Sequence, residues 1–337
     1  MVRLAMVSRP LSEADMRLAK QMGMTDVVTT MPGVSMAPER VQGPAWSYVD
    51  LLHLRQRVEA AGLTLSVIEG YQLSDRITLG QPGRDKDIAR VCETISNMGR
   101  VGIPIYCYNF MAVFNWLRTA TAVRGRGDAL VTRFDAAHLD NAPPTYVGQT
   151  SDEQMWENFR YFLLRVLPVA EAAKVKLALH PDDPPMSPVL GLARIMRSMD
   201  AFKRVLEMAD SPSNGITFCQ GNFAAMGDVD IPSAIRYFGE RKKIFYSHFR
   251  DVRGAVPAFE ETFHDDGKTD MAAAMRAYCD IGYDGPMRPD HAPTMEGESN
   301  DTPGYMMRGQ IFAIGYMKGL IDAVQRDPGQ KGDGMGT

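Results

Sequence analysis

Four potential metal ligands each end a short apolar run in the second half of this 337-residue sequence. They are His180, Cys219, His248 and Asp290, which follow one another at intervals of 39, 29 and 42 positions. Each interval is about the length of one strand and one helix. Nitrogen, sulfur and oxygen donors at the tips of neighbouring parallel strands would meet and could bind a divalent ion. The pattern therefore predicts a metal-dependent enzyme.

The cysteine in this set narrows the choice of metal. A soft sulfur donor beside histidine and aspartate would select manganese, iron, cobalt or zinc over magnesium. A buried cysteine is also often only a small apolar side chain, and a nucleophilic thiolate is a third interpretation. His180 could likewise be a strand end whose imidazole bonds to the backbone. The rigid turn that follows it, Pro181–Pro185, favours a functional role, because Asp182 and Asp183 could orient the imidazole or bind substrate hydroxyls.

Two residues near the last ligand could move protons. His291 follows Asp290 directly, and adjacent residues leaving a strand point in opposite directions. One of them could therefore bind the metal while the other faces the reacting carbon. Tyr305 opens the last predicted helix and is the best aromatic candidate for acid-base catalysis.

Other polar groups near the ligands suit substrate recognition. Arg250 and Arg253 could bind a substrate carboxylate, although either could form a surface ion pair with Asp251 instead. Residues 262–268 form a polar segment that includes His264. This segment could contact the substrate or be a solvated turn, and the sequence does not distinguish these alternatives.

Short apolar runs alternate with longer amphipathic ones along the chain. We expect strands at 3–8, 26–30, 64–70, 104–110, 176–181, 215–221, 244–251 and 286–291. We expect helices at 12–22, 48–61, 85–98, 153–173, 201–208, 231–238, 271–280 and 303–324. Ser12 and Ser151 have the spacing of helix caps. Eight strand-helix pairs predict an α/β fold, a closed (β/α)8 TIM barrel. An open doubly wound sheet is the alternative, but no GxGxxG motif follows the first strand.

Two regions interrupt this rhythm. Residues 117–149 are rich in Ala, Thr, Arg, Gly and Pro, and we interpret them as a long βα-loop insertion that covers a site or forms an oligomer interface. Residues 327–337 are mostly polar and glycine-rich, so we expect a disordered tail. The remaining chain, 1–326, is then a single barrel domain.

The composition excludes several other classes of protein. A formal net charge of -4 without a basic block argues against a nucleic-acid partner and against an anionic membrane surface. No run is long and apolar enough to span a bilayer, and the N-terminus lacks the pattern of a secretory signal. The four cysteines are sparse and irregularly spaced, which fits reduced thiols in the cytoplasm. We therefore expect a cytoplasmic enzyme with a small-molecule substrate.

Beyond these inferences, the motifs from His180 to Tyr305 closely resemble the mannonate dehydratase family. The strings that carry the resemblance are His180-Pro-Asp-Asp-Pro-Pro185, Asp210-Ser-Pro-Ser-Asn-Gly-Ile-Thr-Phe-Cys-Gln-Gly-Asn222, His248-Phe-Arg-Asp-Val-Arg-Gly254, Phe263-His-Asp-Asp-Gly267, Arg288-Pro-Asp-His291 and Pro303-Gly-Tyr305. Weaker similarity extends to 67–69 and 106–111. The resemblance implies a xylose-isomerase-like TIM barrel and a metal-dependent lyase of hexuronate breakdown.

The resemblance also implies roles for particular residues. Manganese (Mn2+, with Fe2+, Co2+ or Zn2+ as alternatives) would be held by His180, Cys219, His248 and Asp290, with His291 and Tyr305 as the acid-base pair. The reaction would remove water from D-mannonate to give 2-keto-3-deoxy-D-gluconate. The substrate contacts that we expect are Asp182, Asn222, Arg250, His264 and Arg288. We also expect a homo-oligomer, namely a dimer.

The first half of the chain departs from the family pattern at three predicted strand tips. Residues 3–8 read Arg-Leu-Ala-Met-Val-Ser where an Arg-Trp-Tyr-Gly strand is usual in the family, and Ser74 stands where a histidine is usual. It has Asn-Trp-Leu-Arg-Thr-Ala at 115–120 where Asp-Trp-Thr-Arg-Thr-Asp is usual. These differences predict a changed substrate pocket beside an intact metal end. A metal-dependent isomerase or epimerase and a non-catalytic paralogue remain as alternative functions.

Overall fold

Eight parallel strands close into a barrel in the order β1-β12-β9-β8-β7-β4-β3-β2. The computed structural model describes residues 2–30 and 45–326. The barrel strands are β1 (Arg3–Val7), β2 (Asp26–Thr29), β3 (Thr64–Gln72), β4 (Ile105–Asn109), β7 (Lys176–Leu179), β8 (Asn214–Cys219), β9 (Ile244–Phe249) and β12 (Pro286–Pro289). Each lies within or overlaps a predicted strand. The predicted TIM barrel is therefore confirmed, and the open doubly wound sheet is wrong because β1 pairs with both β2 and β12.

Eight long helices surround the barrel, as the amphipathic pattern predicts. They are α1 (Glu13–Gln21), α2 (Tyr48–Ala60), α4 (Arg84–Val101), α5 (Asp152–Ala173), α6 (Met199–Met208), α8 (Ile231–Glu240), α9 (Met271–Asp280) and α10 (Met307–Arg326) among the described residues. Hydroxyl caps fix where several of them begin. The side chains of Ser12 and Ser151 accept hydrogen bonds from the backbone N–H groups of Asp15 and Gln154, so both predicted caps are confirmed.

The barrel strands are apolar on both faces because each face is covered. Their inward side chains form one cluster, which includes Val28, Val67, Ile105 and Phe245. Their outward side chains pack against the helices in a larger cluster. Phe218 of β8 belongs to the larger cluster and is stacked on Phe223 with ring centroids 4.4 Å apart. Burying one such ring contributes about 2–3 kcal/mol to stability.

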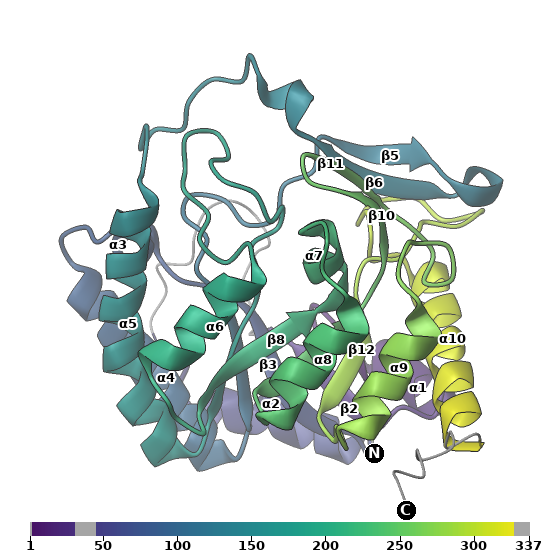
Figure 1. The fold of residues 1–337 in the computed structure, drawn as a ribbon. Coiled ribbons are helices and arrows are strands. Elements are labelled where there is room, and N and C mark those ends of the chain that lie inside the picture. The colour runs from purple at the N-terminus through teal and green to yellow at the C-terminus, as the bar shows by residue number, and fades with distance from the viewer. Residues whose placement is uncertain (1, 31–44, 327–337) are drawn as a thin grey trace, which may run out of the picture.

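A second, four-stranded sheet lies beyond one end of the barrel (top of Figure 1). Its order is β10-β11-β6-β5, with β5 (Ala120–Arg124), β6 (Leu130–Asp135), β10 (Val252–Ala255) and β11 (Ala258–Glu261). We call it the accessory sheet. It joins two loops that are distant in the chain, because β11 after barrel strand β9 pairs with β6 after barrel strand β4.

The accessory sheet adds detail to one sequence prediction and corrects another. Residues 117–149 lie between β4 and α5, as a βα-loop insertion would, and they contain β5, β6 and two short 3-10 helices, Arg126–Asp128 and Ala136–Leu139. The predicted strand 244–251 also ends early, at Phe249, and the chain then turns into the hairpin of β10 and β11. The mixture of charged and apolar residues in these strands gives no clear strand pattern, and the pairing of β11 with β6 joins segments that lie far apart in the sequence.

Two short helices were also missed. The chain after Cys219 forms α7 (Gln220–Ala225), where the sequence predicted that the strand continues to Gly221. The second short helix, α3 (Asp75–Thr78), follows β3. The predicted disordered tail, 327–337, lies outside the described residues.

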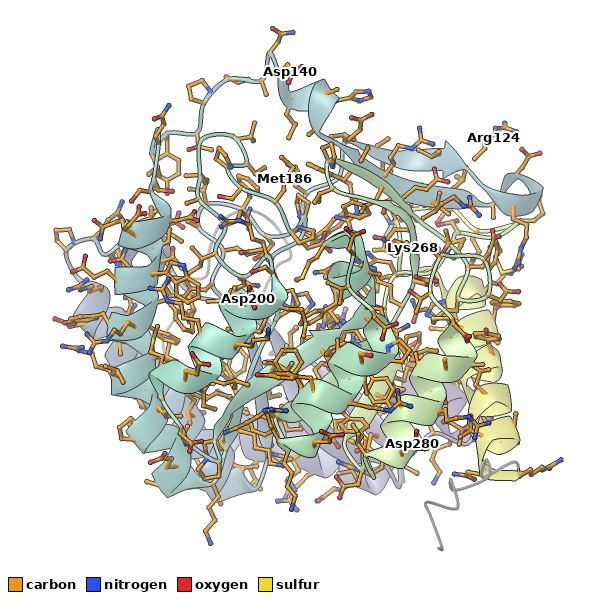
Figure 2. All side chains as sticks on the ribbon, viewed as in Figure 1. Arg124, Asp140, Met186, Asp200, Lys268 and Asp280 are labelled. Atoms are coloured by element: carbon orange, nitrogen blue, oxygen red, sulfur yellow. The ribbon has the colours of Figure 1, made fainter. Side chains whose placement is uncertain are left out.

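Figure 2 helps to locate the two ends of the barrel. Asp140 and Met186, in loops that follow β4 and β7, lie at the end that carries the accessory sheet. Asp280, the last residue of α9, lies toward the opposite end. None of the helices in the described ranges has the length and apolar character that crossing a membrane requires.

Candidate metal centre and active site

The pairing of barrel strands brings the predicted metal ligands together. Cys219 of β8 is the register partner of His248 of β9, and His180 directly follows β7 on the other side of β8. One donor atom each from His180, Cys219 and His248 lies within 4.8 Å of the other two. Because parallel strands present their carboxyl ends at one edge, three residues that are distant in the sequence form one cluster.

A backbone hydrogen bond orients the imidazole of His180. Its Nδ1 lies 2.7 Å from the carbonyl oxygen of Pro181, an atom that can only accept a hydrogen bond. Nδ1 therefore carries the proton, and Nε2 presents its lone pair to the cluster. Burial, the largest influence, lowers the pKa of His180 and favours the neutral ligand form. The predicted hydrogen bond between the His180 imidazole and the backbone is thus present. It leaves the other ring nitrogen, Nε2, free of a proton and able to bind a metal.

A carboxylate lies near each ring nitrogen of His248. Its Nδ1 lies 3.7 Å from Asp290 Oδ2 and 3.3 Å from His180 Nε2, and its Nε2 lies 3.4 Å from Glu69 Oε1. Burial lowers the pKa of His248, but Glu69 and Asp290 offset this effect and raise it to about 8. A metal ion at Nδ1 would displace a proton there, whereas Glu69 would retain the Nε2–H group.

Asp290, which directly follows β12, completes the donor set. Its Oδ2 lies 3.5 Å from Cys219 Sγ and 3.7 Å from His248 Nδ1. Burial raises the pKa of Asp290, but the positive charges around it, with Arg288 at 2.9 Å, lower it well below the usual range. The carboxylate is therefore ionised and can serve as an oxygen ligand.

These residues fit a divalent metal of the first transition series. Two imidazole nitrogens, one sulfur and one carboxylate oxygen form the mixed donor set that such ions accept. His180 is held in the tautomer that coordination requires, and the other imidazole has a carboxylate behind it. The assignment of His180, Cys219, His248 and Asp290 as ligands stays a prediction that this geometry supports.

The two candidate acid-base groups lie beside this cluster. The rings of His291 and Tyr305 meet edge to face with centroids 5.1 Å apart, and the Tyr305 hydroxyl donates to Asp290 Oδ1 at 3.0 Å. Gly304 permits this approach, because its φ of +87° favours glycine and a Cβ there would lie 3.3 Å from the His291 ring. Burial, followed by Asp290, raises the pKa of Tyr305, so the phenol stays protonated at neutral pH.

A cavity at the barrel mouth connects the metal cluster with the acid-base pair. The described residues that line it are Arg9, Glu69, Cys107, Tyr108, Asn109, Met111, Asn115, Trp116, His180, Asp183, Asp290, His291 and Tyr305. Of the predicted site residues, His180, Asp290, His291 and Tyr305 therefore line this cavity. Cys219 and His248 lie immediately behind them and are almost fully buried.

The five predicted substrate contacts have a different placement. Asp182, Asn222, Arg250, His264 and Arg288 are buried, and none of them is among the described lining residues. Arg288 binds Glu69 and Asp290, whereas Arg250 binds Glu261, Asp183 and Asn222. Asp182 accepts from the backbone N–H of Met196. Burial lowers the pKa of His264 to about 4, so its ring is neutral. These residues support the cavity wall from behind, and direct substrate contact stays an untested prediction.

Sequence reasoning missed several residues of the site. Arg9 and Glu69 line the cavity, and Arg118 and Glu261 form buried ion pairs behind it. Arg9 and Glu69 could have been predicted as site residues, because each is a charged residue near the end of an apolar strand. No local pattern indicates Glu261, because it reaches the site through the pairing of the accessory sheet.

Ser74, which stands where the family pattern usually has a histidine, has a structural role. The residue is buried, and its hydroxyl donates to Asp87 Oδ2 at 2.6 Å. It is not among the described residues that line the cavity. The residue that stands where the family usually has histidine therefore helps to attach α3 to α4.

Comparison of the fold with solved structures identifies the class of protein. The structure superposes on L-ribulose 3-epimerase with a TM-score of 0.60 at 14% identity, covering 100% of both chains. It superposes on a xylose isomerase domain protein from Planctomyces limnophilus with a TM-score of 0.58 at 14% identity, covering 96% of this chain and 98% of that one. Similarity at such low identity shows the fold alone, and that fold is a xylose-isomerase-like TIM barrel.

Comparisons at higher identity identify the family. The profile of the D-mannonate dehydratase (UxuA) family matches residues 9–150 and 144–331. A mannonate dehydratase of Streptococcus equi subsp. zooepidemicus is 35% identical, covering 92% of this chain and 91% of the relative, and one of Thermotoga petrophila is 35% identical over 84% and 88%. The crystal structure of mannonate dehydratase from Streptococcus suis serotype 2 superposes with a TM-score of 0.90 at 32% identity, covering 100% and 99%. This chain belongs to the mannonate dehydratase family.

Proposed function

We propose that this chain is a metal-dependent hydro-lyase that removes water from D-mannonate or a closely related sugar acid. One observation carries the proposal. A mixed nitrogen, sulfur and oxygen donor set and an acid-base pair meet at one cavity in a chain of the mannonate dehydratase family. The expected product is 2-keto-3-deoxy-D-gluconate or the corresponding keto acid, as hexuronate breakdown would require.

The donor set supports Mn2+ as the metal, with Fe2+, Co2+ or Zn2+ as alternatives. When bound, such an ion would stabilise the negative charge that develops on the substrate carboxylate as the adjacent carbon loses its proton. His180, Cys219, His248 and Asp290 would hold it. Glu69 and the Pro181 carbonyl would keep the two imidazoles oriented.

His291 and Tyr305 would move the two protons that dehydration requires. One group accepts the proton from the carbon next to the carboxylate. The other donates a proton to the hydroxyl on the neighbouring carbon, which leaves as water. The resulting enol then rearranges to the 2-keto-3-deoxy acid. Both side chains line the same cavity, which allows them to act on adjacent carbons of one substrate.

The charges of the cavity favour a carboxylate-bearing substrate at one position. Three carboxylates, Glu69, Asp183 and Asp290, line the cavity, and Arg9 is the one arginine or lysine among its described lining residues. Arg9 Nη2 lies 2.9 Å from Glu69 Oε1. We infer that Arg9 attracts the substrate carboxylate, because the other buried guanidiniums are committed to ion pairs behind the wall.

Two alternative functions are less well supported. The solved epimerases in the comparison share the fold at 14% identity or less, so they do not favour an isomerase or epimerase. A non-catalytic paralogue would not require His291 and Tyr305 to meet beside the donor set, as they do. We place the enzyme in the cytoplasm because its four cysteines are free thiols. Its assembly as a dimer stays a prediction.

The decisive experiment is a screen of five- and six-carbon aldonic acids with Mn2+, measuring 2-keto-3-deoxy products. We expect product from mannonate or a close analogue, and its loss in His291→Asn and in Tyr305→Phe. Both variants should bind manganese like the wild type. Tyr161→Phe is a matched control, because that hydroxyl donates to Asp85 on the outside of the barrel. A rearranged isomer as the product, or full activity of both variants, would refute the dehydratase.

A further inference from the structure

Glu261 of the accessory sheet reaches the acid-base histidine of the barrel. Its Oε1 lies 3.0 Å from His291 Nδ1, and both residues are almost fully buried. Glu261 is the last residue of β11, whose partner β6 belongs to the loop region that follows β4. The contact therefore connects β12 of the barrel with a sheet assembled from two separate loops.

The hydrogen bonds around this contact determine which ring nitrogen carries a proton. An ionised carboxylate can only accept, so His291 Nδ1 must donate to Glu261. Arg118 Nη2 also lies near Nδ1, at 3.4 Å. Its two hydrogens already have closer acceptors, Asp183 Oδ2 at 3.0 Å and Glu261 Oε1 at 2.6 Å. Arg118 therefore does not compete for the Nδ1 position.

Two guanidinium groups fix the position of the Glu261 carboxylate. Arg250 Nε donates to Oε2 and Arg250 Nη2 donates to Oε1, both at 2.8 Å, in a bidentate pair. Arg118 donates to the same Oε1 from another direction. Burial raises the pKa of Glu261, but Arg250, His291 and Arg118 together lower it to about 2. The carboxylate cannot rotate away from His291 without breaking three charge-assisted hydrogen bonds.

We propose that Glu261 is a positioning residue, which holds His291 with Nδ1 protonated so that only Nε2 exchanges protons with the substrate. This inference rests on the proposed role of His291 in the dehydratase reaction. No hydrogen bond among the described residues engages Nε2, and the His291 ring lines the cavity. The accessory sheet thus supplies part of the catalytic arrangement in addition to covering the barrel mouth.

The neighbouring residue offers a matched control. Successive side chains of a strand point to opposite faces, and Glu260 points outward. Glu260 also pairs with two arginines, Arg133 at 2.7 Å and Arg253 at 3.1 Å, but no ion pair among the described residues joins it to a histidine. Glu260→Gln therefore removes an arginine-paired carboxylate from the same strand and leaves His291 untouched.

The first measurement reads the tautomer directly. Protein labelled with 15N-histidine and loaded with diamagnetic zinc should show neutral His291 with Nδ1 protonated and Nε2 unprotonated. The spectrum of His291→Asn identifies its signals among the six histidines. Finding the Nε2–H tautomer in the wild type would overturn the proposal. The tautomer is read in the wild-type protein and needs no turnover, so the result is independent of the proposed function.

The second measurement tests the kinetic consequence. Glu261→Gln should show a mixed tautomer and a kcat about 10- to 100-fold lower, with KM and manganese content within about twofold of wild type. Glu261→Asp, which keeps the charge but withdraws the oxygen, should be intermediate. Glu260→Gln should match the wild type. An unchanged tautomer and kcat in Glu261→Gln, or an equal loss in Glu260→Gln, would contradict a positioning role.

Discussion

Cys219 and His248 are register partners on adjacent strands of the barrel, and this pairing sets the geometry of the metal centre. The ladder fixes the two Cα positions, so their side chains can converge without help from a loop. His180 and Asp290 join them from strands on either side of this pair. Donors on rigid strands lose little conformational freedom when an ion binds, which favours tight binding.

Replacing the sulfur donor should weaken metal binding selectively. In Cys219→Ser a hard, neutral hydroxyl takes the place of a soft donor, so manganese or zinc affinity should fall by about 10- to 100-fold or more. Metal content per chain after dialysis, measured by mass spectrometry, tests this expectation. Cys279→Ser provides the control, since Cys279 is a half-buried thiol of α9 that is not in the donor cluster. Equal metal content in both variants would contradict the ligand assignment.

Substrate affinity should depend on Arg9. Arg9→Gln removes the positive charge that we assign to the substrate carboxylate, while Glu69 keeps Arg288 as a partner. A lost charge-assisted hydrogen bond costs about 1.5–3 kcal/mol, so KM for the active sugar acid should rise by about 10- to 100-fold. Steady-state kinetics would show this effect, with a smaller change in kcat. Arg17→Gln, on the exposed face of α1, should leave both constants unchanged. A fall in kcat at constant KM would argue that Arg9 acts elsewhere.

Stability in acid should depend on Asp87. This carboxylate of α4 accepts hydrogen bonds from Ser74 at 2.6 Å and from Arg76 at 2.7 Å. Burial raises the pKa of Asp87, but Arg76 and Ser74 lower it below its ordinary value. The folded pKa is therefore below the unfolded one. The stabilisation is present above about pH 4 and is lost as the pH falls through the folded pKa.

We expect Asp87→Asn to lower the free energy of unfolding by about 1–2 kcal/mol at pH 7, a modest value because Arg76 is one-third exposed. The difference from wild type should shrink toward pH 3. Urea denaturation at several pH values measures it. Asp85→Asn, on an exposed position of the same helix, should show a smaller effect. A difference that does not change with pH would show that the Asp87 charge is not what stabilises this contact.

The ligand residues and the barrel could be predicted from the sequence because their signals are local. Each ligand ends an apolar run, and the spacing of these runs equals that of strand-helix units. A parallel barrel then has few ways to place the strand tips, so His180, Cys219, His248 and Asp290 had to lie near one another. His291 and Tyr305 were also found from their own short motifs, and the structure places them on the cavity wall.

The accessory sheet and the surroundings of the ligands were decided only by tertiary structure. Nothing near Glu261 in the sequence indicates that it approaches His291, because β11 gains its position by pairing with a strand more than one hundred residues earlier. The buried arginines show the same limit. Arg250 and Arg288 looked suited to substrate, but Asp183 binds Arg250 and Glu69 binds Arg288, each from a segment far away in the sequence. The identity and order of the donors are a local property of the chain, whereas hydrogen-bond partners and cavity access depend on which distant segments meet when the barrel closes.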